Sequence, residues 1–168
     1  SLFNQLLDGG ITEIEMLYYI ENLNEYDKNI YFSIINKNLQ AENPVKTFLL
    51  SKILFYKIRN DKLNYFHSNI FSNIDLFIIE DYKNFRIMCN TYENNEIENN
   101  KNAIKIQSSV FQDNTYKNTI SKLKSIRIIE DEEYIQSMSD ASGYLYLGKT
   151  DDFDILDSYT EEYFSRES

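Results

Sequence analysis

The stretch IDLFIIEDYKNFRIMCNTY, residues 74–92, decides which fold the sequence predicts. Before Asp61 apolar residues recur at helical intervals, whereas in this stretch the period changes toward two. IDLFIIE and NFRIMCNTY then form two strands joined by DYK, with Phe85, Ile87 and Cys89 on one face. The stretch therefore predicts an antiparallel hairpin.

Upstream of this hairpin, the pattern predicts helices over about residues 1–60. In ITEIEMLYYIENL, Thr12 stands just before the apolar residues that recur at helical intervals, so it is a possible N-cap. Asn43 and Pro44 begin the most apolar helix, since proline at the first helical position gives up no hydrogen bond. We expect this helix to be central, on the strength of Leu49, Leu50, Ile53, Leu54 and Ile58.

Downstream of the hairpin, three more stretches alternate as strands do: NAIKIQSSVF, SIRIIE and GYLYLG. The sequence thus predicts an α+β fold, in which N-terminal helices pack on a predominantly antiparallel sheet of about five strands and a C-terminal helix follows. We expect one domain over 1–168, divided into a helical part at about 1–60, a sheet part at about 61–150 and an acidic C-terminal helix at about 151–166.

Length and composition favour a globular protein. The chain has 168 residues, 42% of them hydrophobic, which is enough to form a core without covalent staples. No apolar run approaches the roughly 20 residues of a membrane helix, and no targeting segment is recognisable. Cys89 is the only cysteine, which excludes an intrachain disulfide and a zinc site built from cysteines. We expect a cytoplasmic protein that does not associate with membranes.

The net charge of −10 is concentrated at one end. Residues 1–128 contain 15 acidic and 15 basic side chains, whereas 129–168 contain 12 acidic ones against Lys149 and Arg166. A negative field of this kind repels nucleic-acid phosphates and attracts basic proteins. The predicted partner is therefore a basic protein and not a nucleic acid.

Two acidic groups near the C-terminus are the candidate site. The two groups flank the predicted strand GYLYL. If their loops emerge at the same edge, their carboxylates would surround the two tyrosines of the strand, and tyrosine is common in protein interfaces. The candidate partner-binding residues are Glu130, Asp131, Glu132, Glu133, Tyr144, Tyr146, Asp151, Asp152, Asp154, Asp157, Glu161 and Glu162. The alternative is that the acids form only the solvent-exposed face of a helix whose N-cap is Asp151. A calcium-binding loop is not indicated, because the turn glycine and the closing glutamate of that pattern are absent.

Two other patterns suggest chemistry only weakly. GYLYLGKT, residues 143–150, formally matches the phosphate-binding pattern G-x-x-x-x-G-K-[ST], yet its apolar alternation is typical of a strand. His67 and Cys89 could form a thiol and imidazole pair, although neither lies in a turn that would expose a nucleophile. We expect Cys89 to be a core thiol and His67 a loop or core-edge histidine.

The sequence favours a protein without enzymatic activity, metal or cofactor. Its predicted function is a small acidic protein-binding module, of the immunity or inhibitor type, that neutralises a basic protein such as a toxin nuclease. One alternative is an acidic chaperone for a secreted protein. The other is a nucleotide-binding enzyme that uses residues 143–150.

Overall fold

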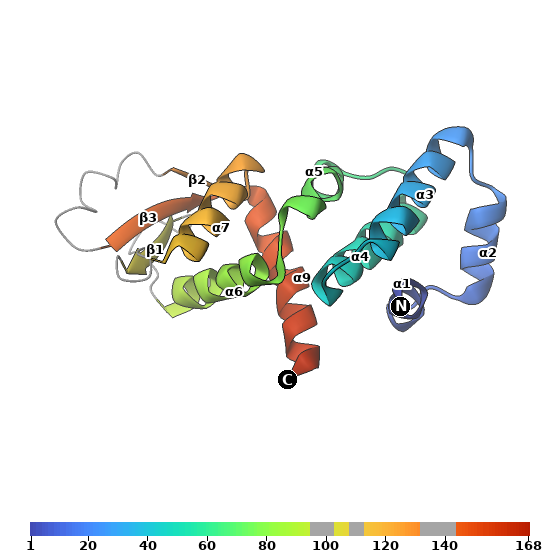
Figure 1. Cartoon of the computed structure of the whole chain (residues 1–168). Helices are drawn as coiled ribbons and strands as arrows, with labels where there is room; N and C mark the ends of the chain where they lie inside the picture. The colour runs from blue at the N-terminus through green and yellow to red at the C-terminus, as the bar shows by residue number, and fades with distance from the viewer. Residues whose placement is uncertain (95–102, 108–112, 132–143) are drawn as a thin grey trace. The chain divides into compact units, whose positions relative to one another are not determined.

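The chain folds into two compact units, Ser1–Ile74 and Asp75–Ser168 (Figure 1). The computed structural model describes residues 1–94, 103–107, 113–131 and 144–168. Helices dominate both units. That residues 1–168 form one domain stays a prediction.

The N-terminal unit is helical throughout. Its central element is α4, which contacts α1, α3 and α5 and buries Val45, Phe48, Leu50 and Ile53. The prediction that this apolar helix is central is confirmed. The helices of this unit are α1 (Leu2–Asp8), α2 (Glu13–Glu21), α3 (Glu25–Leu39), α4 (Pro44–Asn60) and α5 (Tyr65–Asn73), and the short 3₁₀ helix η1 (Ile74–Leu76) leads out of it.

The predicted helix starts in this unit are confirmed. The Thr12 hydroxyl accepts a hydrogen bond from the Glu15 amide, and the Glu15 carboxylate accepts one from the Thr12 amide, which makes a capping box. Asn43 caps α4 by accepting from the Lys46 amide, and Pro44 is the first helical residue. These local signals fix where α2 and α4 begin.

The C-terminal unit combines three helices with a small sheet. Its elements are α6 (Ile79–Asn94), β1 (Ala103–Gln107), α7 (Asn114–Ser125), β2 (Ile129–Asp131), β3 (Tyr144–Lys149) and α9 (Asp151–Glu167). The described strands form an antiparallel sheet in the order β1-β3-β2, with Ile104 opposite Leu147 and Ile129 opposite Lys149. Helix α6 contacts β1, α7 and α9, so it forms the core of this unit.

The predicted fold class is wrong. The protein is mostly helical, and the sheet seen in the described residues has three strands instead of about five. Within its own unit the sheet is contacted by helices α6, which contacts β1, and α7, which contacts β2.

The error lies in residues 79–94, which form α6 and not a hairpin strand. Tyr82, Phe85, Met88 and Cys89 are buried, and their spacing of three and four residues is that of one helix face. Ile87 is 49% exposed, so Phe85, Ile87 and Cys89 share no buried face. The stretch resembled a strand because Phe85 and Cys89, four residues apart, lie on the same face in a helix and also in a strand.

The other predicted strands are present but shorter or shifted. The strand predicted at 102–111 corresponds to β1, and residues 108–111 lie outside the described residues. The prediction at 125–130 begins too early, because Ser125 still belongs to α7. GYLYLG corresponds to β3, although Gly143 is not among the described residues. The predicted C-terminal helix is confirmed as α9.

A buried carboxylate joins α6 to α7. Asp81 is 2% exposed and accepts hydrogen bonds from the Thr119 hydroxyl at 2.7 Å, from Lys122 Nζ at 2.6 Å and from the Ile78 amide at 2.9 Å. The bond to Ile78 lies at the start of α6, where backbone amides lack helical partners. One side chain thus satisfies a helix end and ties two helices together.

We predict that Asp81→Asn lowers the free energy of unfolding by about 2 to 3 kcal/mol, because the amide cannot replace the carboxylate toward both Thr119 and Lys122. Urea unfolding followed by circular dichroism measures the loss. The matched control is Glu25→Gln, which breaks only the surface pair with Lys28 and should change stability by less than about 0.5 kcal/mol. Equal effects of the two substitutions would contradict this role of Asp81.

Candidate functional site

The start of α9 is held against the strand β2. Thr150, and not Asp151 as predicted, is the N-cap residue of α9, and its hydroxyl donates to the carbonyl oxygens of Arg127 and Ile128 instead of capping the helix. The Thr150 amide also donates to the Ile128 carbonyl at 3.2 Å. These bonds fix the first turn of α9 beside the residues that lead into β2.

This connection brings part of the two predicted acidic groups to the same edge of the unit. Glu130 pairs with Gly148 across the sheet, two residues before Thr150. Adjacent strands lie about 4.8 Å apart, so Glu130 lies near the start of α9 and its carboxylates. Glu132 and Glu133 lie outside the described residues. Asp131 lies one residue further along β2, opposite Leu147, and pairs with Lys124 of α7. That the two acidic groups form one surface stays a prediction.

Three exposed acids of α9 lie along one side of the helix. Asp151, Asp154 and Glu161 are exposed, and their spacing of three and seven residues places them on one face. Asp151, Asp152 and Asp154 also stand in the first turn, where negative charge is favourable beside the helix dipole. Partial burial and the neighbouring Asp151 raise the pKa of Asp152.

Other predicted residues are engaged within the protein. Asp157 pairs with Arg86 of α6, and both side chains are largely buried, which makes Asp157 a link between α9 and α6. Ion pairs join Asp131 to Lys124 at 2.5 Å, Asp154 to Lys149 at 3.3 Å and Glu162 to Arg166 at 2.5 Å. Tyr146 is half-buried, and the side chain of Tyr144 is not among those that the structure describes.

Residues 144–150, the described part of GYLYLGKT, have the geometry of a strand end. β3 extends through Lys149, whose ammonium lies 5.4 Å from the centre of the Phe153 ring and 3.3 Å from Asp154. Thr150 uses its hydroxyl on two backbone carbonyls. The interpretation as a strand is confirmed, and this geometry gives nucleotide binding no support.

Cys89 and His67 are core residues. Cys89 is buried in α6, as predicted. His67 lies in α5, is 2% exposed and stacks on Tyr56 with ring centres 4.1 Å apart. Its Nδ1 lies 2.5 Å from the side-chain oxygen of Asn64, an acceptor, so Nδ1 carries the proton. Burial lowers the pKa of His67 to about 4.

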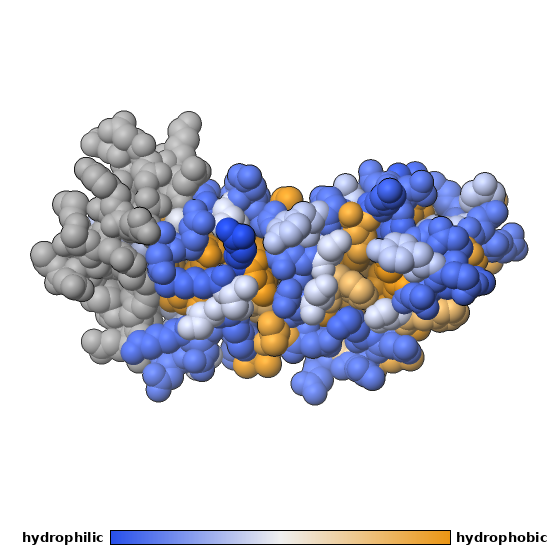
Figure 2. Space-filling model, turned by 90° about the horizontal axis from the view of Figure 1, so that it is seen from above, coloured by the Kyte–Doolittle hydropathy of each residue, from blue (hydrophilic) through white to orange (hydrophobic). Residues whose placement is uncertain are grey.

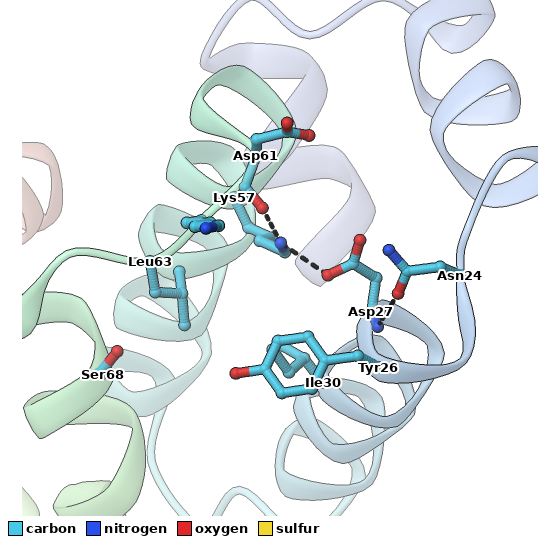
Figure 3. A pocket seen from close by; sticks show the side chains of 9 residues that line it. Asn24, Tyr26, Asp27, Ile30, Lys57, Asp61, Leu63 and Ser68 are labelled. Carbon is cyan, nitrogen blue, oxygen red and sulfur yellow. Dashed lines mark hydrogen bonds and ion pairs between the residues drawn. The ribbon is translucent and has the colours of Figure 1, made fainter.

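A pocket of about 530 Å³ in the N-terminal unit was not predicted from the sequence. Its wall contains Lys57, which is 2% exposed, and Figure 3 shows the Lys57 ammonium between Asp27 and Asp61. The ammonium lies 2.7 Å from the Asp27 carboxylate and donates to the Asp61 carbonyl. One signal could have revealed it: Lys57 follows Leu50, Ile53 and Leu54 on the buried face of α4.

A second pocket of about 500 Å³ adjoins α2 and shares Asp27 and Asp61 with the first. Its lining residues include three acids, Glu15, Asp27 and Asp61, and the basic residue Arg59. The hydroxyl of Tyr19 on its wall is buried without a hydrogen-bond partner. Burial, with Asp27 nearby, raises the Tyr19 pKa to about 12, so the phenol is neutral and can donate.

Comparisons with known proteins give no family. No protein-family model, curated protein or solved structure matches the chain. Across the described segments, no helix is long and apolar enough to cross a membrane. Within those same segments, no three His, Cys, Asp or Glu side chains come together as a metal site would require.

We predict that Asp27→Ala lowers the free energy of unfolding by about 3 kcal/mol, because it leaves the buried ammonium of Lys57 without its carboxylate. The double variant Asp27→Ala with Lys57→Met should be less destabilised, since no unpaired charge remains. Chemical unfolding of the three proteins measures both values. As a control, Lys28→Met at an exposed pair should change stability by less than about 0.5 kcal/mol. Equal losses in the single and double variants would exclude an uncompensated charge as the cause.

We predict that stability falls as the pH drops below about 6.5, because His67 stays neutral in the folded protein down to about pH 4 while the unfolded chain takes up a proton. Between about pH 7.5 and 5.5 this contribution amounts to about 1 kcal/mol. His67→Phe keeps a ring on Tyr56 and removes the titration, so its urea unfolding should lose that much less over the same interval. An identical pH dependence in both proteins would contradict the assignment.

Proposed function

We propose that the protein is a non-enzymatic binding module of the immunity or inhibitor type that neutralises a basic protein partner, such as a toxin nuclease. The observation that carries the proposal is the row of exposed carboxylates on one side of α9, Asp151, Asp154 and Glu161, with Glu130 beside its first turn. Such a row attracts a positively charged surface over a Debye length of about 8 Å at physiological salt.

The packing of α9 supports a rigid binding surface. Phe153, Leu156 and Tyr163 bury the opposite side of the helix, and the Phe153 ring packs edge-on against Phe85 at 5.1 Å. The Arg86 to Asp157 pair adds a second attachment to α6. A partner would therefore meet carboxylates whose backbone is already ordered, which reduces the entropy lost on binding.

A specific observation also favours the alternative of an acidic chaperone for a secreted protein. A chaperone needs apolar side chains that are open to its client in the free state. On α2, Ile14 is 80%, Leu17 59% and Tyr18 69% exposed.

The test of the proposed function uses the triple variant Asp151→Asn, Asp154→Asn and Glu161→Gln. The tagged full chain is used to capture its partner from a lysate of the native cells, and the association rate of the purified partner is then measured at low and high salt. We expect a basic partner whose association is about tenfold slower with the triple variant and less sensitive to salt, because the steering charges are gone.

The matched control neutralises three exposed acids elsewhere, Glu42→Gln, Asp75→Asn and Glu80→Gln, so that the net charge changes equally. If the control slows association as much as the triple variant does, only total charge matters and the α9 surface is excluded. A captured partner that is acidic would refute the proposal outright.

A further inference from the structure

Helix α2 carries its most apolar side chains on its outer side. Ile14, Leu17 and Tyr18 are spaced three and four residues apart, which places them on one face, and all three are exposed. No residue of α2 is buried. Helices of globular proteins normally turn such a stripe toward the core. Figure 2 shows apolar surface among polar surface over the N-terminal unit.

The inner side of α2 is the more polar one. Glu15 forms an ion pair with Arg59 of α4 at 2.9 Å, and Arg59 also donates to the Gly10 carbonyl. The Tyr19 ring meets Tyr31 of α3 at 6.4 Å. These contacts hold the helix in the orientation that leaves its apolar stripe outside.

The pocket beside α2 continues this stripe. Tyr18 belongs to both the stripe and the pocket lining, so a segment that packs on Leu17 and Tyr18 reaches the pocket directly. Among the residues that line the pocket, Glu15 pairs with Arg59 and Asp27 pairs with Lys57, so Asp61 supplies the excess negative charge. Tyr19, whose hydroxyl is buried without a hydrogen-bond partner, is also one of these lining residues. A cationic side chain fits this lining better than an anionic or apolar one.

The charges around the stripe select one kind of partner. Residues 1–27 contain six acidic side chains and no Lys or Arg. Three of these acids, Glu15, Glu25 and Asp27, pair with Arg59, Lys28 and Lys57, so the remaining negative charge near the stripe comes mainly from Glu13 and Glu21. Glu21 continues the stripe one turn on, and Glu13 flanks it. Two copies of this chain packed stripe to stripe would bring these acids together, and an anionic lipid surface would be repelled by them. A short helix packed on its own copy would also bury too little area for a stable dimer.

We propose that α2 and the adjoining pocket bind a basic amphipathic segment of another protein. Apolar side chains of that segment cover Ile14, Leu17 and Tyr18, and a Lys or Arg side chain enters the pocket toward Asp27 and Asp61. This surface lies on the N-terminal unit, so the proposal does not depend on the carboxylates of α9.

The experiment selects peptides by their chemistry. A phage-displayed library of random peptides of about 16 residues, long enough for an amphipathic helix, is selected on the immobilised full chain at about 0.15 M salt. We expect the bound peptides to be rich in Lys and Arg and to repeat apolar residues at three and four positions. Selection of acidic or uncharged peptides would overturn the proposal.

A selected peptide is then titrated calorimetrically into variants of the full chain. Leu17→Ser should raise its Kd about tenfold through lost apolar contact, and Asp61→Asn should weaken the salt dependence. The matched control is Leu39→Ser at the end of α3, where the side chain is 77% exposed, and it should leave Kd unchanged. Both leucines are exposed, so neither substitution removes core packing. Equal effects of Leu17→Ser and Leu39→Ser would overturn the proposal.

Two further measurements separate this surface from other possibilities. The variant Asp151→Asn with Asp154→Asn should bind the selected peptide as the unchanged chain does. If this variant loses the peptide and Leu17→Ser keeps it, the peptide binds the acidic α9 surface and the inference fails while the proposed function stands. A dimer in sedimentation that Leu17→Ser dissociates, or binding to phosphatidylserine vesicles that it abolishes, would assign the stripe to a second copy or to lipid and overturn the inference.

Discussion

The structure of the C-terminal unit depends on the burial of one face of α6. Phe85, Met88 and Cys89 lie on that face, and the helix contacts β1, α7 and α9. Two charged contacts attach its flanks, from Asp81 to Lys122 of α7 and from Arg86 to Asp157 of α9. Apolar burial supplies the driving force, while the buried charges specify which helices meet, because each would be costly without its partner. The exposed carboxylates of α9 have a fixed place for this reason.

Much of the local structure could be predicted from the sequence, and the fold class could not. Helix starts follow short-range rules, so the capping box at Thr12 and the cap at Asn43 were predictable. In residues 84–92 a helical period and a period of two both fit Phe85 and Cys89. Only the exposure of Ile87 distinguishes them, and exposure is set by the tertiary contacts of α6. A short apolar segment is ambiguous for this physical reason.

The candidate site shows the same division between local and tertiary information. Charge along the chain predicted an acidic C-terminal region, yet it could not show that Asp157 is paired with Arg86, 71 positions away. The balance of 15 acids and 15 bases over residues 1–128 also concealed the acidic first 27 residues. The burial of Lys57 could not be predicted for another reason. A lysine among apolar residues can extend its ammonium to solvent or bury it, and here the ammonium is buried because it pairs with Asp27 of another helix.

The two surfaces differ in what they can contribute to a complex. Exposed carboxylates such as Asp151 and Asp154 remain largely solvated, so they act at a distance and mainly on the rate of association. The stripe of Ile14, Leu17 and Tyr18 acts only on contact, where removal of apolar area from water slows dissociation. Charge that selects a basic partner and apolar area that retains it are complementary requirements of tight binding. The exposure of both kinds of surface supports the proposed binding module, and it applies equally to an inhibitor and to a chaperone.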